Sequence, residues 1–311
     1  MTKPTLRLAH SPDSDDLVMW WPLTGMRAPD GTPVEGELGT PRIDTEGFSF
    51  ELVGEDVEAL NRAVTDEGDR NGRMPFEITA ISAATYPYIA DRWVITRCGG
   101  SFGEGYGPKV VVGNDAPFED LADLEGKTIA VPGRRTSAFA ALTMALDGAR
   151  FEPLEVLFSD VPTAVVDGRA DGGLLIHEAQ LTFGSLGLRA VADMGVWWSE
   201  RTGLALPLGL NVVRRDLDER FGAGSVERVS RALSRSVAYA VERAEESRRY
   251  LLMHAEERSE WHDADLVEKY LSMYVSRMSL DMGERGEEAL RRFLGAACEQ
   301  GLTPRCEVGV V

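Results

Sequence analysis

The chain has 311 residues, of which 43% are hydrophobic, and a formal net charge of −18 at pH 7. This length and hydrophobic content suit one large or two ordinary α/β domains and exclude a disordered chain. The negative charge argues against binding to nucleic acid or to an anionic membrane surface, but it still allows a small anionic ligand. Three cysteines without a C-x-x-C pair exclude a complete disulfide framework.

Short apolar runs alternate with helical stretches over the first two-thirds of the chain. This alternation predicts a largely parallel sheet with helices on its faces. A helix is predicted over 56–64 with Asp56 as its N-cap, and 27–46 is predicted to be an exposed loop. The predicted strands cover 5–10, 48–53, 76–81, 93–97, 110–113, 127–131, 154–158, 173–176, 189–192 and 208–213.

After Arg215 the pattern becomes helical, so the C-terminal third is predicted to have no sheet of its own. The predicted helices cover 226–242, 245–255, 264–278 and 284–300. The glycine-rich stretch 99–107 precedes a strand instead of following one, so it fits neither a dinucleotide-binding nor a phosphate-binding loop. We expect it to be a connector between domains.

Membrane and secretion signals are missing from the sequence. No apolar stretch of about 7–15 residues precedes the acidic cluster that ends at Asp16, and no run reaches about 18 apolar residues. We therefore expect a cytoplasmic protein without membrane contact. The sequence does not indicate an oligomeric state.

Metal and hydrolase motifs fail on their spacing. His177-Glu178 begins a zinc-binding H-E-x-x-H pattern, but its fifth position is Leu181. The other histidines, His10, His254 and His262, show no metal-like spacing with the cysteines. No G-x-S-x-G motif is present, so we predict neither a metal site nor a serine hydrolase.

One candidate binding stretch is VPGRRTSAF, residues 131–139, where a strand meets Pro-Gly and then a helix. Backbone N–H groups at a helix start bind carboxylates, and the hydroxyls of Thr136 and Ser137 can assist them. The alternative is that Thr136 or Ser137 only caps its own helix.

A second candidate is SPDSDD, residues 11–16, at the carboxyl end of the first strand, where open α/β sheets bind ligands. Its three aspartates can bind ligand hydroxyls or perturb one another's pKa, or else act as N-caps and first-turn acids. The third candidate is His177, which follows the apolar run Leu174-Leu175-Ile176. A histidine there is either a working residue or a structural strand end.

Six blocks of the sequence resemble one enzyme family, the 1,4-dihydroxy-6-naphthoate synthases of the futalosine route to menaquinone. The resemblance runs from about Leu6 to Gly301, in the blocks EDVEALNR, ITAISAATYPYIADR, GGSFGEGYGP, VPGRRTSAF, GLLIHEAQLTF and DMGVWWSERTGLALPLG. It implies a two-lobe fold like that of type 2 periplasmic binding proteins, with the ligand between the lobes. The chain would cross between lobes near 108–113 and 207–215, so that 1–109 plus 214–311 form one lobe and 110–213 the other.

The resemblance also implies a reaction and its residues. His177 matches the family's catalytic base, and Ser82, Ser137 and Ala138 match ligand-contacting positions. The reaction converts cyclic dehypoxanthinyl futalosine, a carboxylated small molecule, into 1,4-dihydroxy-6-naphthoate and dihydroxyacetone without a cofactor. Burial is expected to lower the pKa of His177, whereas Glu178 would raise it if its carboxylate lay close. Neighbouring residues of an extended strand point to opposite faces, so Glu178 is expected to turn away from the ligand. With Ser11, Asp16 and Thr136 these residues form the predicted site. Trp20, Trp21, Trp197 and Trp198 are candidate aromatic walls, but each is expected to belong to the core instead.

The acidic turn departs from the family pattern. Relatives often read Ser-Pro-Cys-Pro-Asn-Asp-Thr where this chain has Ser11-Pro12-Asp13-Ser14-Asp15-Asp16-Leu17, so Asp16 is kept but negative charge is added. This difference leaves room for a changed substrate. Two other functions remain open: a chorismate dehydratase, which would share the fold, and a non-catalytic solute-binding protein.

Overall fold

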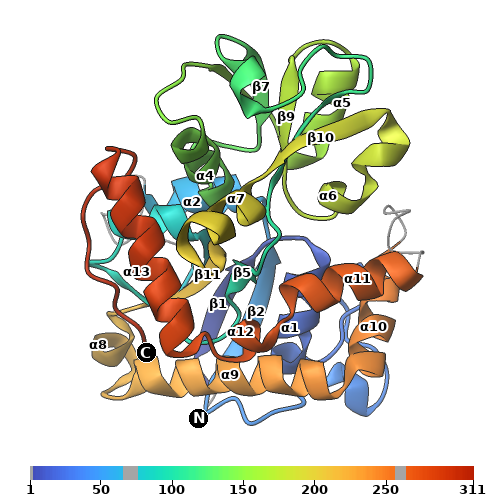
Figure 1. Ribbon diagram of the computed structural model, residues 1–311. Helices are drawn as coiled ribbons and strands as arrows, with labels where there is room; N and C mark the ends of the chain where they lie inside the picture. Colours follow the sequence, from blue (N-terminus) through green and yellow to red (C-terminus); the bar gives the residue numbers. More distant parts are fainter. Residues whose placement is uncertain (1–2, 66–75, 256–263) are drawn as a thin grey trace.

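The strands of the protein form two separate sheets. The computed structural model describes residues 3–65, 76–255 and 264–311 (Figure 1). The first sheet has the order β2-β1-β3-β11-β4, with β5 also paired to β11, and the second has the order β10-β6-β9-β7-β8. The first contains β1 Thr5–His10, β2 Ser49–Gly54, β3 Ile78–Ser82, β4 Trp93–Ile95, β5 Ser101–Gly103 and β11 Leu206–Arg214. The second contains β6 Lys109–Gly113, β7 Thr128–Val131, β8 Glu152–Glu155, β9 Gly172–Leu175 and β10 Leu188–Asp193.

Both sheets are mixed, so the prediction of a largely parallel sheet was wrong. β1 runs parallel to β2 and β3, and β7 runs parallel to β8 and β9. β11 runs antiparallel to β3, β4 and β5, and β6 runs antiparallel to β9 and β10. β6 and β11 are the strands that enter each sheet from the other one, and their apolar sequences carry no information about direction.

The chain passes between the two sheets twice. It leaves the first sheet after β5 and enters the second at β6, and it returns through α7 Met194–Thr202 into β11. Both passages fall near the predicted crossings at 108–113 and 207–215. The division into 1–109 plus 214–311 and 110–213 remains a prediction. Because β11 pairs with the first sheet from Leu206 onward, the pairing favours a second boundary before Leu206.

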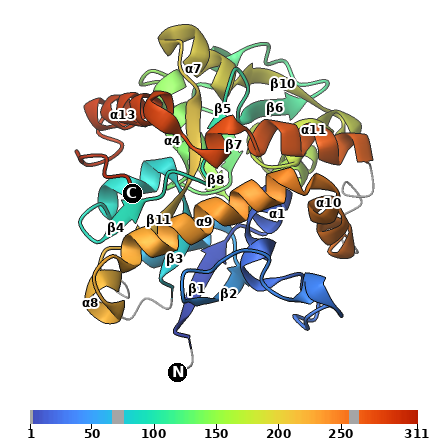
Figure 2. The ribbon, with the colours of Figure 1, turned by 90° about the horizontal axis from the view of Figure 1, so that it is seen from below.

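The C-terminal third is helical and covers the first sheet, as the sequence predicts (Figure 2). Its long helix α9, Ser225–Glu242, places Val229, Leu233 and Val237 at helical spacing on one buried face. These side chains pack with Leu6 and Leu8 of β1. The other helices of this part are α8 Leu217–Phe221, α10 Ala244–Met253, α11 Ala264–Tyr274, α12 Arg277–Leu280 and α13 Gly283–Glu299.

One predicted C-terminal helix is divided in two. The periodicity over 264–278 predicted a single helix, but α11 ends at Tyr274 and α12 begins at Arg277. The side chain of Ser276 accepts a hydrogen bond from the N–H of Met278 and so caps the second helix. Within 3–65, 76–255 and 264–311, no helix has the length and apolar character needed to cross a membrane.

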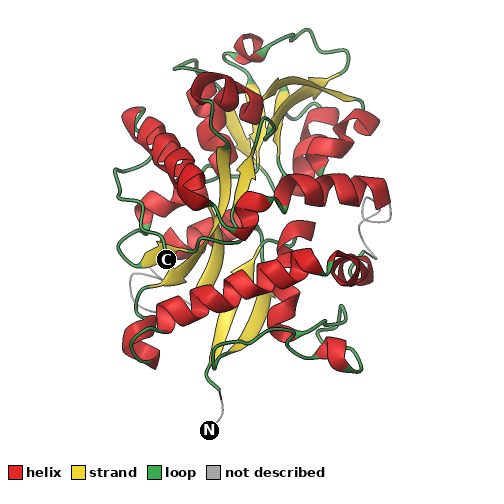
Figure 3. Ribbon diagram, turned by 60° about the horizontal axis from the view of Figure 1, so that its bottom comes forward, coloured by secondary structure: helices red, strands yellow, loops and turns green. Residues whose placement is uncertain are grey.

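The remaining helices connect the strands and surround the two sheets (Figure 3). They are α1 Ser14–Thr24, α2 Val57–Thr65, α4 Ser137–Ala145, α5 Val161–Val166 and α6 Ala179–Thr182. Asp56 caps α2 as predicted, since its carboxylate accepts hydrogen bonds from the N–H groups of Glu58 and Ala59. The N-termini of α1 and α4 follow strands of different sheets, and both reach the pocket described next.

Candidate active site

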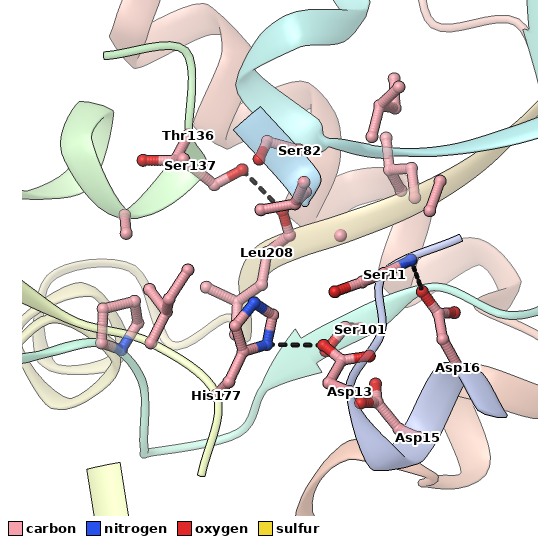
Figure 4. A pocket seen from close by; sticks show the side chains of 18 of the residues that line it. Ser11, Asp13, Asp15, Asp16, Ser82, Ser101, Thr136, Ser137, His177 and Leu208 are labelled. Atoms are coloured by element: carbon pink, nitrogen blue, oxygen red, sulfur yellow. Dashed lines mark hydrogen bonds and ion pairs between the residues drawn. The ribbon is translucent and has the colours of Figure 1, made fainter. Parts of the chain in front are cut away.

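A pocket is lined by residues from elements of both sheets (Figure 4). The first-sheet part contributes the turn after β1, the end of β3 and the middle of β11, and the second contributes the start of α4 and the turn after β9. All seven residues of the predicted site line this pocket: Ser11, Asp16, Ser82, Thr136, Ser137, Ala138 and His177.

The imidazole of His177 is held by a carboxylate from the other sheet. Its Nδ1 lies 2.6 Å from Oδ2 of Asp13. The edge of the ring also meets Phe158, with ring centroids 4.7 Å apart. Because Nδ1–H donates to Asp13, the lone pair of the neutral ring is on Nε2. Figure 4 shows the second ring nitrogen pointing away from Asp13, toward the side of the pocket where Leu208 and Ser137 lie.

The backbone turns sharply at His177. Its φ of 53° lies in the left-handed region, which a residue with a side chain seldom adopts. His177 therefore does not continue the extended strand β9, which ends at Leu175. The alternation of an extended strand consequently does not apply to His177 and Glu178. Glu178 is nevertheless absent from the pocket lining, because its carboxylate contacts Ser14.

The protonation states of the pair follow from this contact. Burial acts to lower the pKa of His177, but the negative charge of Asp13, with smaller effects of Glu178 and Asp56, raises it overall. Burial thus acts in the expected direction, and Glu178 raises the pKa as expected for a close carboxylate. The net shift is upward because of Asp13, which was not foreseen. Burial acts to raise the pKa of Asp13, but the charge and hydrogen bond of His177 lower it overall. Asp13 is thus ionised at neutral pH and stabilises an imidazolium next to it.

The other two aspartates of the acidic turn are far less acidic than usual. Burial and the charge of Asp13 raise the pKa of Asp16 to about 7. Burial, together with the charges of Asp13 and Asp16, raises the pKa of Asp15 well above its usual range. The carboxylate of Asp16 accepts hydrogen bonds from the Ser11 N–H at 2.8 Å and from Trp20 Nε1 at 3.0 Å. Asp16 thereby shapes the turn that carries Asp13.

The start of helix α4 shows the capping role, one of the two alternatives that the sequence left open. Thr136 is the N-cap, and its Oγ1 accepts from the Phe139 N–H at 3.1 Å. The Ser137 hydroxyl donates to the Leu208 carbonyl at 2.7 Å and accepts from the Ala84 N–H at 3.2 Å. Both hydroxyls are therefore engaged with the protein. The first N–H groups of a helix, here those of Ser137 and Ala138, find no acceptor within the helix and remain suited to an anion.

Ser82 is fixed at the end of β3 by a reciprocal pair of hydrogen bonds. Its N–H donates to Oδ1 of Asn61 at 2.8 Å, and Nδ2 of Asn61 donates back to its Oγ at 3.0 Å. Ser82 thus presents a rigid hydroxyl to the pocket.

The glycine-rich stretch is part of the pocket wall and not only a connector. Gly99 and Ser101 both line the pocket, and β5 pairs with β11. Gly99 has a φ of +75°, and a side-chain carbon there would lie 2.7 Å from Nδ2 of Asn211. Only glycine therefore allows this close approach.

The four candidate tryptophans belong to the core, as expected, and do not form aromatic walls of the pocket. The described pocket lining includes none of them. The core side chains bury Trp20, Trp21 and Trp198. Trp197 packs against the core cluster that contains Trp198. No group of three or more His, Cys, Asp or Glu side chains suited to a metal is found among the described residues. His262 lies outside them.

Comparisons with known proteins place the chain in a family. The family model described as menaquinone biosynthesis matches residues 6–299. The chain belongs to the menaquinone-biosynthesis family. It is 38% identical to a 1,4-dihydroxy-6-naphthoate synthase of Thermus thermophilus, over 96% of this chain and 95% of that one. It is 32% identical to the enzyme of the same name from Streptomyces coelicolor, over 98% and 96% of the two chains.

Solved structures agree with the fold of this menaquinone-biosynthesis family member. A protein of Archaeoglobus fulgidus has a TM-score of 0.78 at 36% identity, covering 96% of this chain and 98% of that one. An alkanesulfonate-binding protein of Xanthomonas axonopodis has a TM-score of 0.66 at 15% identity, covering 100% and 99%. The second likeness concerns the fold alone. The chain has the two-lobe fold of periplasmic binding proteins, as the sequence predicts.

Two pocket residues of this family member were missed from the sequence. Asp13 was considered only as part of an acidic turn. The signal that marks it is that it replaces a neutral residue of the family pattern. Asn211 lies in the middle of β11, where a polar residue interrupts an apolar strand. That interruption is the signal that could have found it.

Proposed function

We propose that this chain is a 1,4-dihydroxy-6-naphthoate synthase, a carbon–carbon lyase of menaquinone biosynthesis. It converts cyclic dehypoxanthinyl futalosine into 1,4-dihydroxy-6-naphthoate and dihydroxyacetone. The observation that carries the proposal is a partly buried imidazole, oriented by Asp13, in the same pocket as the N-terminus of α4. The first group removes a proton, and the second binds a carboxylate.

In the proposed reaction His177 is the general base. Its Nε2 takes a proton from an acidic C–H of the substrate, and the adjacent Asp13 carboxylate stabilises the imidazolium that forms. The raised pKa makes the imidazole of His177 a stronger base than that of free histidine. The same shift means that a smaller fraction of the imidazole is neutral at low pH. Positioned proton transfer of this kind contributes about 10²–10⁴-fold in rate.

The donor groups of the pocket bind and stabilise negative charge. The N–H groups of Ser137 and Ala138 receive the substrate carboxylate, and the hydroxyl of Ser82 lies in the same pocket for oxyanions that develop as the carbon–carbon bond breaks. This chemistry needs only proton transfer and charge stabilisation. The proposed enzyme therefore works without a cofactor.

We also propose that the enzyme acts in the cytoplasm as a protein without membrane or nucleic-acid contacts. The three cysteines, Cys98, Cys298 and Cys306, are free thiols, which suits a reducing compartment. The net charge of −18 opposes binding to nucleic acid and anionic lipid.

Incubation of the purified protein with cyclic dehypoxanthinyl futalosine tests the function. The expected result is formation of 1,4-dihydroxy-6-naphthoate, detected by chromatography, together with an equal amount of dihydroxyacetone. A metal chelator should leave the rate unchanged. Tight binding of the compound without any product would instead indicate a solute-binding protein, and turnover of chorismate would indicate the dehydratase.

A further inference from the structure

One end of the pocket holds hydrogen-bonding atoms without a protein partner. Among the described residues, Ser11 Oγ, Asp13 Oδ1 and Asn211 Oδ1 are buried and form no hydrogen bond of acceptable geometry. All three residues line the pocket, and each is at most 4% exposed. Buried polar atoms are rarely left unpaired, because each costs about 1–3 kcal/mol. Their presence together in one pocket therefore points to a ligand.

The chemistry of these atoms defines what the ligand must offer. Nδ2 of Asn211 donates to the Gly99 carbonyl at 2.8 Å, so the orientation of the amide is fixed and its free atom is the acceptor Oδ1. Asp13 is ionised, so its Oδ1 is also an acceptor. The Ser11 hydroxyl lies close enough to Asp13 to favour the ionised carboxylate, and it can either donate or accept. The ligand group that fits must donate at least two hydrogen bonds.

The ionised Asp13 and the acidic side chains beside it disfavour a carboxylate at this end of the pocket. Asp13, Asp15 and Asp16 lie together here, and Figure 4 shows them with Ser11 on one side of the pocket, opposite Thr136 and Ser137. His177 lies between the two groups in this view. The pocket therefore has an acceptor end and a donor end, with the imidazole between them.

We propose that Ser11, Asp13 and Asn211 form a subsite for the hydroxyl-bearing part of the substrate. Vicinal or neighbouring hydroxyls donate to Asn211 Oδ1 and Asp13 Oδ1, and the Ser11 hydroxyl bonds a third oxygen. The inference rests on the proposed function, since the three-carbon fragment that leaves as dihydroxyacetone carries the hydroxyls. It fixes the direction of the substrate: the hydroxyls lie against the acidic turn, and the carboxylate lies against α4.

The substitution Ser11→Ala tests the subsite, because it removes a buried hydroxyl without a well-formed hydrogen bond and leaves the backbone bond to Asp16 in place. Two ligands are compared: the full substrate, through kcat/KM, and 1,4-dihydroxy-6-naphthoate, through its inhibition constant. The naphthoate lacks the three-carbon fragment. We expect Ser11→Ala to lower kcat/KM about 3- to 10-fold, the loss of one neutral hydrogen bond. The inhibition constant of the naphthoate should stay unchanged.

Ser137→Ala is the matched control at the donor end. It removes the hydroxyl that ties the start of α4 to the Leu208 carbonyl and the Ala84 N–H, so the N–H groups that receive the carboxylate are held less firmly and both ligands should bind more weakly. If Ser11→Ala weakens the naphthoate as much as the substrate, or affects neither, the subsite is overturned while the proposed function stands. A wild-type protein that forms no naphthoate at all would overturn the proposed function, and the subsite with it. A thermal melt of Ser11→Ala at or above that of wild type verifies that the fold is intact.

Discussion

Glu178 accepts two hydrogen bonds from Ser14, from the backbone N–H at 3.3 Å and from the hydroxyl at 2.9 Å. Ser14 is the first residue of α1. At a helix start, the side chain of the preceding N-cap residue normally accepts hydrogen bonds from the first N–H groups of the helix. Asp13 occupies the N-cap position but makes no capping bond. Glu178 takes over this role from the other sheet, and the carboxylate of Asp13 is left to bind His177.

Replacement of Asp13 by asparagine should remove the negative charge that lies next to the imidazole of His177. The amide side chain of the variant has nearly the same shape as the carboxylate but no negative charge, so the pKa of His177 falls and the imidazolium loses its stabilising partner. We expect kcat to fall about 10²- to 10⁴-fold, as for other disrupted acid–base groups. The measurement is the pH–rate profile of Asp13→Asn beside wild type and the exposed control Asp115→Asn.

The midpoint of the rising limb of the pH–rate profile distinguishes an effect of Asp13 on the pKa of His177 from a purely structural role. A base must be deprotonated, so wild-type activity should rise with pH with a midpoint above 6.5, in the direction of the raised pKa of His177. In Asp13→Asn the midpoint should move to lower pH. A reduced rate with an unmoved midpoint would mean that Asp13 serves only to maintain the fold.

His177→Asn should separate binding from turnover. The variant keeps a polar side chain that can still donate to Asp13, so the fold and most of the substrate affinity are expected to remain. Turnover should fall about 10²–10⁴-fold, because no other side chain replaces the base. Calorimetry gives the affinity, and chromatography gives the rate. If the variant forms product as fast as wild type, His177 has only a structural role in the turn after β9.

Thr136→Ala should lower stability more than it affects ligand binding. Its hydroxyl accepts from the Phe139 N–H and donates to the Gly133 carbonyl, so its removal leaves the start of α4 uncapped. The expected loss is about 1 kcal/mol in the free energy of unfolding, within the range of about 0.5–2 for N-caps. Urea denaturation measures the loss. Thr136→Ser, which keeps the hydroxyl, should stay close to wild type, and equal losses in both variants would contradict the capping role.

The stability of the protein should decrease as pH rises from about 4 to about 7. The pKa of Asp16 is raised from 3.8 to about 7, so in this window the native state holds a proton that the unfolded chain has lost. Each unit of pH then costs up to about 1.4 kcal/mol for that proton. His177, whose pKa is also raised, adds stability below 6.5 that is lost as pH passes its folded pKa.

Asp16→Asn provides the test of this dependence. Urea midpoints measured in steps across the window should fall steadily in wild type and in the exposed variant Asp115→Asn. They should fall less in Asp16→Asn, where the raised pKa values of Asp15 and His177 still act. A wild-type stability that is constant from pH 4 to pH 7 would show that Asp16 is ionised throughout the window.

Much of the fold was accessible from the sequence, because strands such as β1 and the helix α9 are marked by strong local periodicity. The direction of β6 and β11 was not accessible, since it depends on where the chain crosses between sheets. In the same way His177 was recognisable from its place after an apolar run and from the family blocks. Its partner Asp13 was not, because the pair forms between residues far apart in sequence. The pKa of His177 was misjudged for the same reason.

The pairing of Asp13 with His177 also constrains motion. Asp13 is carried by the turn after β1 of the first sheet, and His177 by the turn after β9 of the second. A hinge movement that separates the sheets to admit a ligand must therefore pull the imidazole away from its carboxylate, and must break the bonds between Ser14 and Glu178 as well. In the proposed mechanism the base is therefore paired with its carboxylate only when the cleft is closed around a ligand, and in an open cleft the two side chains are apart.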